Sequence, residues 1–282
     1  NVQVAPMRLL NYDLFNSTAQ ITQDIPFCET PQRTLKLDVY KPHGVHRNRL
    51  PAIIVIHGGG WHNGDKGNWF APHNRYLAAC GYAVFDVQYR FTTENTFWPD
   101  QLADIRAAIR HVKTNADEYG IDPDRVAIIG RSAGAQLALQ AAYRASGDDA
   151  DTQVQSVIGL YTPGNLFITA QQHDHRVVTF LGGTSYENPD RYHDASPITH
   201  IDENSPPTLL IHGYKDILVT PIHSEMLLNR LRQYKRPAAF LRLPWARHGF
   251  DAVPFGMGAF LVQYYVDRFL AITLHAETDN ER

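Results

Sequence analysis

The hydrophobic positions form short β-type runs that alternate with helix-type runs from about residue 34 onward. The runs that are apolar almost throughout, as in strands buried on both faces, lie at residues 51–56, 82–87, 126–129, 154–160 and 208–211. Residues 34–40 alternate apolar and polar positions instead, which predicts a half-buried outer strand. The alternation of strands and helices predicts an α/β fold with a mostly parallel central sheet flanked by helices.

Apolar residues at helical spacing occupy the segments between the predicted strands. In residues 100–119, Leu102, Ile105 and Ile109 fall on one face, and charged residues fall on the other. Gly120 fits the C-cap of this crossover helix. Three further helices are predicted at residues 133–144, 221–234 and 256–273. Together these helices would cover the sheet.

Residues 163–207 depart from this rhythm, because they are rich in Pro, Gly, His, Asp and Asn. We interpret them as a small insertion over the ends of the strands, acting either as a lid or pocket element or as a plain connection. The length of 282 residues fits one large domain. We therefore expect an N-terminal extension over residues 1–33 and a single domain over residues 34–282.

Composition excludes several classes of protein. Hydrophobic residues make up 44% and charged residues 20%, as in an ordinary globular chain. The formal net charge of -3 offers no basic surface for nucleic acid, so no such partner is expected. No apolar stretch is long enough to span a bilayer. Because the chain begins at Asn1 and not at Met, a leader, an anchor or an upstream domain could have been removed, and the localisation stays open.

The two cysteines, Cys28 and Cys80, leave the redox compartment equally open. They could pair, stay reduced, or be buried as small apolar side chains.

The sequence Gly130-Arg131-Ser132-Ala133-Gly134 follows a strand-like run directly and precedes a helical run. A serine in this setting, flanked by two glycines, is typical of a nucleophile elbow, a turn so tight that larger neighbouring side chains would collide. Ser132 would then lie at a helix N-terminus, where backbone N–H groups favour developing negative charge. The alternative is a glycine-lined helix start with Ser132 as its N-cap.

The sequence His57-Gly58-Gly59-Gly60-Trp61 also follows a strand-like run. Three successive glycines allow backbone N–H groups to turn toward a neighbouring site without clashes from Cβ atoms. An oxyanion hole is the natural use of such a loop. A nucleotide-binding loop is the alternative, but the spacing fits neither G-x-G-x-x-G nor a Walker motif.

A serine nucleophile needs a general base, and the base needs an acid that fixes its tautomer. His248 lies in a loop between the last strand-like run and the final helix, so it is preferred among the 14 histidines. Asp216 lies in the loop after a buried strand, and its carboxylate is expected at the same sheet edge. Asp251 and Asp194 are the less favoured acids. The sequence therefore predicts a triad of Ser132, Asp216 and His248.

These features resemble the α/β-hydrolase carboxylesterases, especially the HGGGW-type esterases related to hormone-sensitive lipase and the bacterial feruloyl and acetyl-xylan esterase group. The order Ser, Asp, His along the chain is that of the α/β-hydrolase fold. The likeness spans about residues 34–273. The motifs that carry it, beside the elbow, are HGGGW at residues 57–61, GDK at 64–66, YR at 89–90, YGIDPDRV at 119–126 and HGYKD at 212–216.

The resemblance implies transfer of an acyl group from an ester to Ser132 and then to water. By motif position it also implies oxyanion donors in the backbone of Gly59, Gly60 and Ala133. No metal and no organic cofactor are implied.

Four residues within these motifs are candidates for contacts with the substrate or for structural roles. Arg131 stands where related enzymes often carry an acidic or small residue, and it is a candidate for the substrate pocket. Trp61 is a second candidate, or else an aromatic cover over the oxyanion loop. Asp65 and Lys66 are read as an ion pair that steadies this loop in preference to substrate contacts.

We therefore expect a serine carboxylic-ester hydrolase that acts on small or short-acyl esters, with feruloyl or acetyl esters of sugars among the candidates. An arylformamidase-like amide hydrolase and a non-catalytic binding module of the same fold are the alternatives. A metal site at His173, Asp174 and His175 is disfavoured, because no further ligand set is evident. The natural substrate and the oligomeric state stay open.

Overall fold

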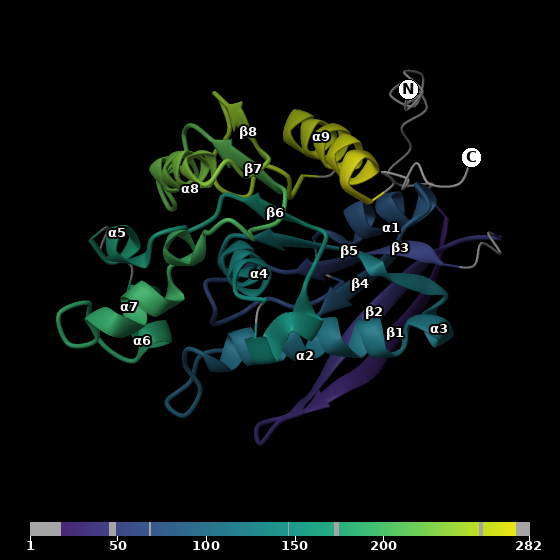
Figure 1. Ribbon diagram of the computed structural model, residues 1–282, viewed down its shortest axis with the longest axis horizontal. Coiled ribbons are helices and arrows are strands. Elements are labelled where there is room, and N and C mark those ends of the chain that lie inside the picture. The colour runs from purple at the N-terminus through teal and green to yellow at the C-terminus, as the bar shows by residue number, and fades with distance from the viewer. Residues whose placement is uncertain are drawn as a thin grey trace.

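The computed structural model describes residues 18–44, 49–67, 69–145, 147–171, 175–253 and 256–274. In this part of the chain, eight strands form one sheet with the order β1-β2-β4-β3-β5-β6-β7-β8. Helices cover both faces of the sheet (Figure 1). The predicted α/β-hydrolase fold is confirmed.

Most neighbouring strands in the sheet are parallel. Only the pairings of β1 with β2 and of β2 with β4 are antiparallel in the described residues. Parallel neighbours need long crossover connections, and the helices supply them. The strands are β1 (Ala19–Glu29), β2 (Thr34–Pro42), β3 (Leu50–Ile56), β4 (Ala83–Val87), β5 (Ile121–Arg131), β6 (Ser156–Leu160), β7 (Thr208–Gly213) and β8 (Ala238–Leu243).

Two hydrophobic cores lie on the two faces of the sheet because side chains alternate along each strand. Ile53 of β3 points into a core with helices α1 and α9, whereas Ile54 points into a core with α2, α4 and α8. The helices are α1 (Ala71–Ala79), α2 (Asp100–Thr114), α3 (Ala116–Tyr119), α4 (Ala133–Tyr143), α5 (Leu166–Gln171), α6 (His175–Leu181), α7 (Pro189–Ala195), α8 (Ile222–Gln233) and α9 (Met257–Leu274).

The sheet begins earlier in the chain than the sequence pattern indicates. Residues 19–29, expected in an N-terminal extension, form β1 and pair with β2 along its length. Register irregularities lie between Thr22 and Ile25 and between Pro26 and Cys28. They break the two-residue period that would have revealed the strand. The domain boundary expected at residue 34 therefore falls inside the sheet.

The segment at 163–207 is more regular than expected. It contains α5, α6, α7 and a short 3-10 helix at Pro197–His200, which group together at the left of Figure 1. Phe180, Leu181 and Tyr192 of this segment are fully buried in the core that contains α4. The insertion is thus packed into the domain.

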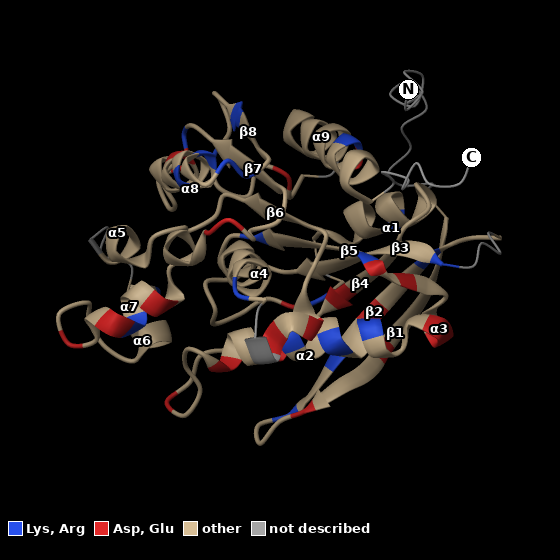
Figure 2. Cartoon of the chain, in the orientation of Figure 1, with Lys and Arg blue, Asp and Glu red and all other residues tan. Residues whose placement is uncertain are grey.

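The structure bears on three predictions made from composition: the mixed surface charge, the lack of a membrane span and the state of the cysteines. Acidic and basic residues are interspersed along α2 and the neighbouring strands (Figure 2). In the part of the chain that the structure describes, no helix has the length and apolar character needed to cross a membrane. Cys28 and Cys80 are not joined in a disulfide.

Candidate active site

Ser132 occupies a strained turn between β5 and α4. Its φ of 54° and ψ of -120° are unusual for a residue with a side chain and are typical of a nucleophile elbow. A Cβ atom at Gly130 would lie 2.2 Å from the carbonyl oxygen of Gly134, and one at Gly134 would lie 2.3 Å from that of His57. Only glycine fits at both positions, so the predicted elbow is present.

The structure brings Ser132, Asp216 and His248 together from three separate loops. His248 Nε2 lies 3.0 Å from Ser132 Oγ, and His248 Nδ1 lies 2.7 Å from Asp216 Oδ2. A proton on Nδ1 that is donated to the carboxylate leaves Nε2 able to accept the serine proton. This is the arrangement that activates a serine hydroxyl.

Asp216 is held as a carboxylate by its surroundings. Its Oδ1 accepts hydrogen bonds from the backbone N–H groups of Leu218 at 2.9 Å and Val219 at 3.0 Å. Burial acts to raise the pKa of Asp216, but the interactions with His212 and His248 outweigh it and hold this pKa well below its usual range. The Asp216 carboxyl group is therefore ionised at neutral pH.

The two less favoured acids have other partners. Asp251 accepts hydrogen bonds from Arg131 at 2.7 Å and from Tyr161 at 2.9 Å. Asp194 accepts one from Trp98 Nε1 at 2.7 Å. The geometry thus favours Asp216 as the partner of the histidine.

The glycine loop runs alongside the nucleophile. A Cβ atom at Gly58 would lie 3.4 Å from Ser132 Cβ. Gly59 and Gly60 have φ values of 128° and 62°. A Cβ atom at Gly59 would lie only 1.8 Å from the carbonyl oxygen of Asn63, so a side chain is excluded there. Glycine therefore permits a tight turn beside Ser132.

His57 supports this loop from the buried side. Its ring stacks on Tyr89 with 4.5 Å between centroids, and its Nδ1 lies 2.7 Å from the carbonyl oxygen of Gly58. Burial lowers the pKa of His57 to about 4. The imidazole is neutral at pH 7, and its contacts agree with a role in orienting the loop.

Trp61 does not take the position expected of a pocket residue. Its side chain is buried, stacks on Phe180 with 4.4 Å between centroids, and donates a hydrogen bond to Gln136 at 2.9 Å. It is not among the described residues that line the cavity at Ser132. Trp61 instead supports the glycine loop from behind, because its partners come from α6 and α4.

The expected ion pair between Asp65 and Lys66 is also replaced by other contacts. Lys66 Nζ lies 2.7 Å from Asp38 and 3.0 Å from Asp24, while Asp65 accepts a hydrogen bond from Gln88 at 2.8 Å. Lys66 therefore ties the end of the loop to β1 and β2. The predicted ion pair is therefore wrong, and Asp65 lines the cavity beside Ser132.

A cavity of about 360 Å³ opens at Ser132. Arg131, predicted as a pocket residue, contributes to its wall. Sequence reasoning missed Arg176, which reaches the cavity from α6, and Tyr161, although Tyr161 directly follows β6 as active-site residues often do. The lining residues are His57, Gly58, Gly59, Gly60, Asn63, Gly64, Asp65, Trp69, Phe70, Arg131, Ser132, Tyr161, Arg176, Leu218, His248 and Gly249.

The insertion is fastened to the rest of the domain by hydrogen bonds to its backbone. Gln136 and Gln140 of α4 donate to the carbonyl oxygens of Ala195 at 2.8 Å and Asp194 at 3.0 Å. The backbone N–H of Trp98 donates to the carbonyl oxygen of Phe180 at 2.9 Å. These contacts fix the segment that carries Arg176.

No cluster of three or more potential metal ligands occurs among the residues that the structure describes. His173 and Asp174, two members of the disfavoured metal site, lie outside those residues.

The BD-FAE family model matches residues 37–231 of the chain. The probable carboxylic ester hydrolase LipM of Mycobacterium tuberculosis is 34% identical over 81% of this chain and 56% of its own length. The esterase LipC of the same organism is 31% identical over 76% of this chain and 57% of its own length. The chain thus spans somewhat more than half the length of these curated relatives.

Solved structures of lower sequence identity have the same fold. A carbohydrate esterase from gut microbiota superposes with a TM-score of 0.78 at 24% identity, over 93% of this chain and 98% of the other. Esterase 2 of Thermogutta terrifontis superposes with a TM-score of 0.77 at 24% identity, over 93% and 95% of the two chains. With the fold, the elbow and the matched family model in agreement, the chain belongs to the BD-FAE family of α/β-hydrolase esterases.

Proposed function

We propose that this protein is a serine carboxylesterase with Ser132 as nucleophile, His248 as general base and Asp216 as the acid that orients the base. The observation that carries the proposal is the hydrogen-bonded series from Ser132 Oγ through His248 to Asp216, at 3.0 and 2.7 Å. The ester hydrolases among the relatives support the same reaction.

The reaction follows from the geometry. His248 Nε2 takes the hydroxyl proton as Ser132 Oγ attacks the ester carbonyl carbon. The tetrahedral intermediate then collapses to an acyl-serine, and the imidazolium gives its proton to the leaving alcohol. A water molecule, deprotonated by the same imidazole, attacks the acyl-serine and regenerates the hydroxyl. Asp216 stabilises the imidazolium in both halves of the reaction.

Backbone N–H groups of Gly59, Gly60 and Ala133 would stabilise the oxyanion of each tetrahedral intermediate. Two observations support this assignment. The glycine loop passes close to Ser132, and Ala133 is the first residue of α4, where N–H groups have no partner within the helix.

Small esters with a short acyl group are the proposed substrates. The cavity of about 360 Å³ is lined by charged residues such as Asp65 and Arg176 together with the aromatic Phe70, which suits a compact, partly polar molecule. Trp69, an aromatic residue of the kind that often contacts sugars, lines the cavity and is 69% exposed. A structural neighbour, the bifunctional hydrolase of Caldicellulosiruptor lactoaceticus, is named for acetyl ester and xyloside substrates. Acetyl esters of sugars are therefore prime candidates.

The insertion is proposed to act as a fixed wall of this pocket. Two observations support this proposal: Phe180 of the insertion is fully buried, and Gln136 and Gln140 of α4 donate hydrogen bonds to the backbone of the insertion. Arg176 then gives the pocket a cationic side chain from a segment that is anchored at several points.

Replacing the nucleophile tests the reaction type. Ser132→Ala should lower kcat for p-nitrophenyl acetate by at least about 10⁴-fold, because the attacking oxygen is gone. Ser185→Ala, in the insertion, is the matched control and should hydrolyse the ester at the wild-type rate. Turnover by Ser132→Ala near that of the control would refute the proposal, and inactive wild-type protein would favour a binding module.

A substrate panel tests the pocket. We expect kcat/KM to be higher for acetyl and butyryl esters and for an acetylated xyloside than for an octanoyl ester, since a compact pocket cannot bury a long chain. A matched acetanilide and a formamide should be turned over more slowly than the ester. The reverse order in either comparison would contradict the substrate class.

A further inference from the structure

The residue beside the nucleophile forms a buried ion pair with the loop that carries His248. Arg131 precedes Ser132 and ends β5, whereas Asp251 follows His248 by three positions. Arg131 Nε donates to Asp251 Oδ2 at 2.7 Å, and the two side chains are 5% and 0% exposed. Removal of one partner from such a pair leaves a buried charge without compensation. The pair therefore fastens the two segments together.

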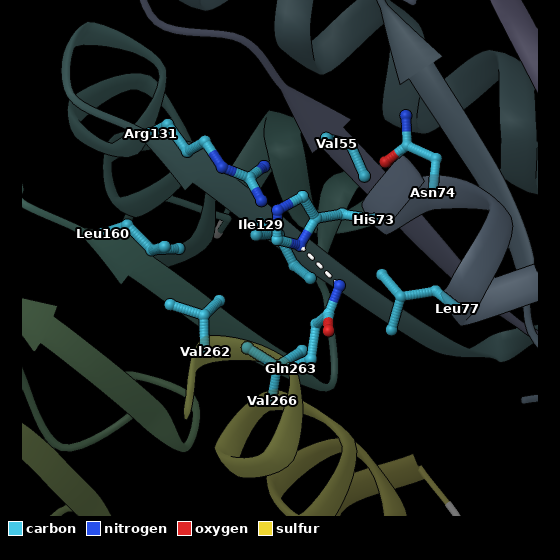
Figure 3. Close-up of a pocket in the computed structure, with 10 residues that line it drawn as sticks. All are labelled: Val55, His73, Asn74, Leu77, Ile129, Arg131, Leu160, Val262, Gln263 and Val266. Atoms are coloured by element: carbon cyan, nitrogen blue, oxygen red, sulfur yellow. Dashed lines mark hydrogen bonds between the residues drawn. The ribbon is translucent and has the colours of Figure 1, made fainter. Parts of the chain in front are cut away.

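Asp251 is fixed from several elements of the fold. Its Oδ1 accepts a hydrogen bond from Tyr161 Oη at 2.9 Å, and its backbone oxygen lies 3.0 Å from His73 Nε2. His73 Nδ1 lies 3.1 Å from Gln263 Nε2, the contact drawn as a dashed line in Figure 3. Because Gln263 donates to Nδ1, His73 Nε2 carries the proton that Asp251 accepts. Asp251 thus has little freedom to move.

Tyr161 connects this group directly to the catalytic imidazole. The centroid of its ring lies 4.6 Å from that of His248, and its hydroxyl is bound to Asp251. Burial raises the pKa of Tyr161 well above its usual value, so the phenol keeps its proton and remains a donor. The surface against which His248 packs is therefore itself held by Asp251.

Arg131 also supports the wall of the cavity. Its guanidinium carbon lies 4.0 Å from the centre of the Phe70 ring, and Phe70 lines the cavity with Ser132. The side chain thus contacts an aromatic face and a carboxylate at once, as the planar guanidinium favours. Figure 3 shows the guanidinium directed toward His73.

We propose that Arg131, Asp251 and Tyr161 are positioning residues that hold the His248 ring at hydrogen-bonding distance from Ser132. This inference rests on the proposed esterase function. Asp251 is not among the described residues that line the cavity, so it acts through His248 and not through contact with substrate. A shift of the imidazole by about 1 Å would cost up to about 100-fold in rate.

Asp251→Asn gives the sharpest test, because it removes the charge and keeps the shape. With p-nitrophenyl acetate, we expect kcat per active site titrated by a fluorophosphonate to fall about 10- to 100-fold, with KM changed by less than about threefold. Titration matters because a purely structural role would reduce the number of active sites and leave kcat per site unchanged.

Asp104→Asn is the matched control. Asp104 forms a comparable ion pair with Arg90, 2.8 Å between Arg90 Nη2 and Asp104 Oδ1, with side chains 13% and 2% exposed. It should keep the wild-type kcat per titrated site. If kcat per titrated site falls less than about threefold in Asp251→Asn, or no more than it falls in Asp104→Asn, the inference is overturned. Inactive wild-type protein would instead remove the proposed function on which it rests.

Two milder variants keep the inference open to test should Asp251→Asn fail to fold. Tyr161→Phe keeps the ring against His248 and removes the hydrogen bond to Asp251, so kcat per site should fall about threefold or more. Arg131→Lys should recover part of the kcat lost in Arg131→Met, because it retains the charge. Unchanged kcat in Tyr161→Phe, or equal loss in both Arg131 variants, counts against positioning by this group.

Discussion

The carboxylate of Asp216 acts on Ser132 only through the imidazole between them. It accepts the Nδ1 proton of His248 at 2.7 Å, and two backbone N–H groups stabilise its negative charge. The preferred tautomer of the base therefore depends on this single contact. Its loss should affect the chemical step much more than substrate binding.

Asp216→Asn should lower kcat by about 10⁴-fold, because an amide N–H directed at the imidazole favours the wrong tautomer. Steady-state kinetics on p-nitrophenyl acetate at pH 8 provide the measurement, with Asp104→Asn as the control for loss of a buried carboxylate. A decrease smaller than that in Asp251→Asn would mean that the acid of the triad has been assigned to the wrong residue.

Site residues could be predicted where their positions follow from the chain itself. Ser132, Asp216 and His248 each lie in a loop that follows a strand, and parallel strands end at a common edge. The partners of Trp61 and Lys66 could not be predicted in this way. They come from segments far away in sequence, and only the packing of the folded chain selects them.

The insertion holds the glycine loop in place through an aromatic stack. Phe180 of α6 packs on Trp61, which follows Gly60 directly, and Trp61 in turn donates to Gln136 of α4. The loop is thereby held between the insertion and the helix that begins at the nucleophile. The position of α6 and the shape of the loop should change together.

Phe180→Ala should lower the free energy of unfolding by about 3–5 kcal/mol, because it leaves a cavity in a fully buried site. Phe180→Leu retains much of the volume and should cost clearly less. Urea unfolding followed by fluorescence measures both variants. A cost below about 1 kcal/mol for Phe180→Ala would show that the stack does not anchor α6.

The boundaries of strands and helices could be predicted where the hydrophobic pattern is regular, but not where it is interrupted. The apolar runs of β3 and β7 identify them as central strands, and all their residues are buried. In β1 the register shifts around Asp24 and Phe27 remove the period. The predicted helix over residues 100–119 is divided at Asn115 into α2 and α3.

Buried histidines link the stability of the whole protein to pH. Burial lowers the pKa values of His57, His73 and His223 to about 4. The unfolded chain, with imidazole pKa values near ~6.5, binds more protons between about pH 4 and 6.5. Their stabilising contribution is therefore present above about pH 6.5 and is lost as the pH falls to about 4. Asp86, whose pKa burial raises to about 7, acts in the opposite direction.

We expect Tm to fall as the pH is lowered from 7 to 5, because proton uptake by His57, His73 and His223 in the unfolded chain outweighs the opposite contribution of Asp86. His223→Asn removes one titrating group, and it should weaken the pH dependence by about 1 kcal/mol per pH unit. Calorimetry at several pH values compares the variant with wild type. Identical slopes for the two proteins, or a flat wild-type profile, would contradict this linkage.

Intact-protein mass spectrometry after reaction with a fluorophosphonate, which phosphonylates an activated serine with loss of fluoride, tests most directly whether Ser132 is the nucleophile. Wild-type protein should gain one adduct, and peptide mapping should place it on Ser132. Ser132→Ala should gain none, and His248→Asn should react at least about 100-fold more slowly, because its serine lacks a base. An adduct on another residue, equal labelling of Ser132→Ala, or an unmodified wild-type protein would contradict the account.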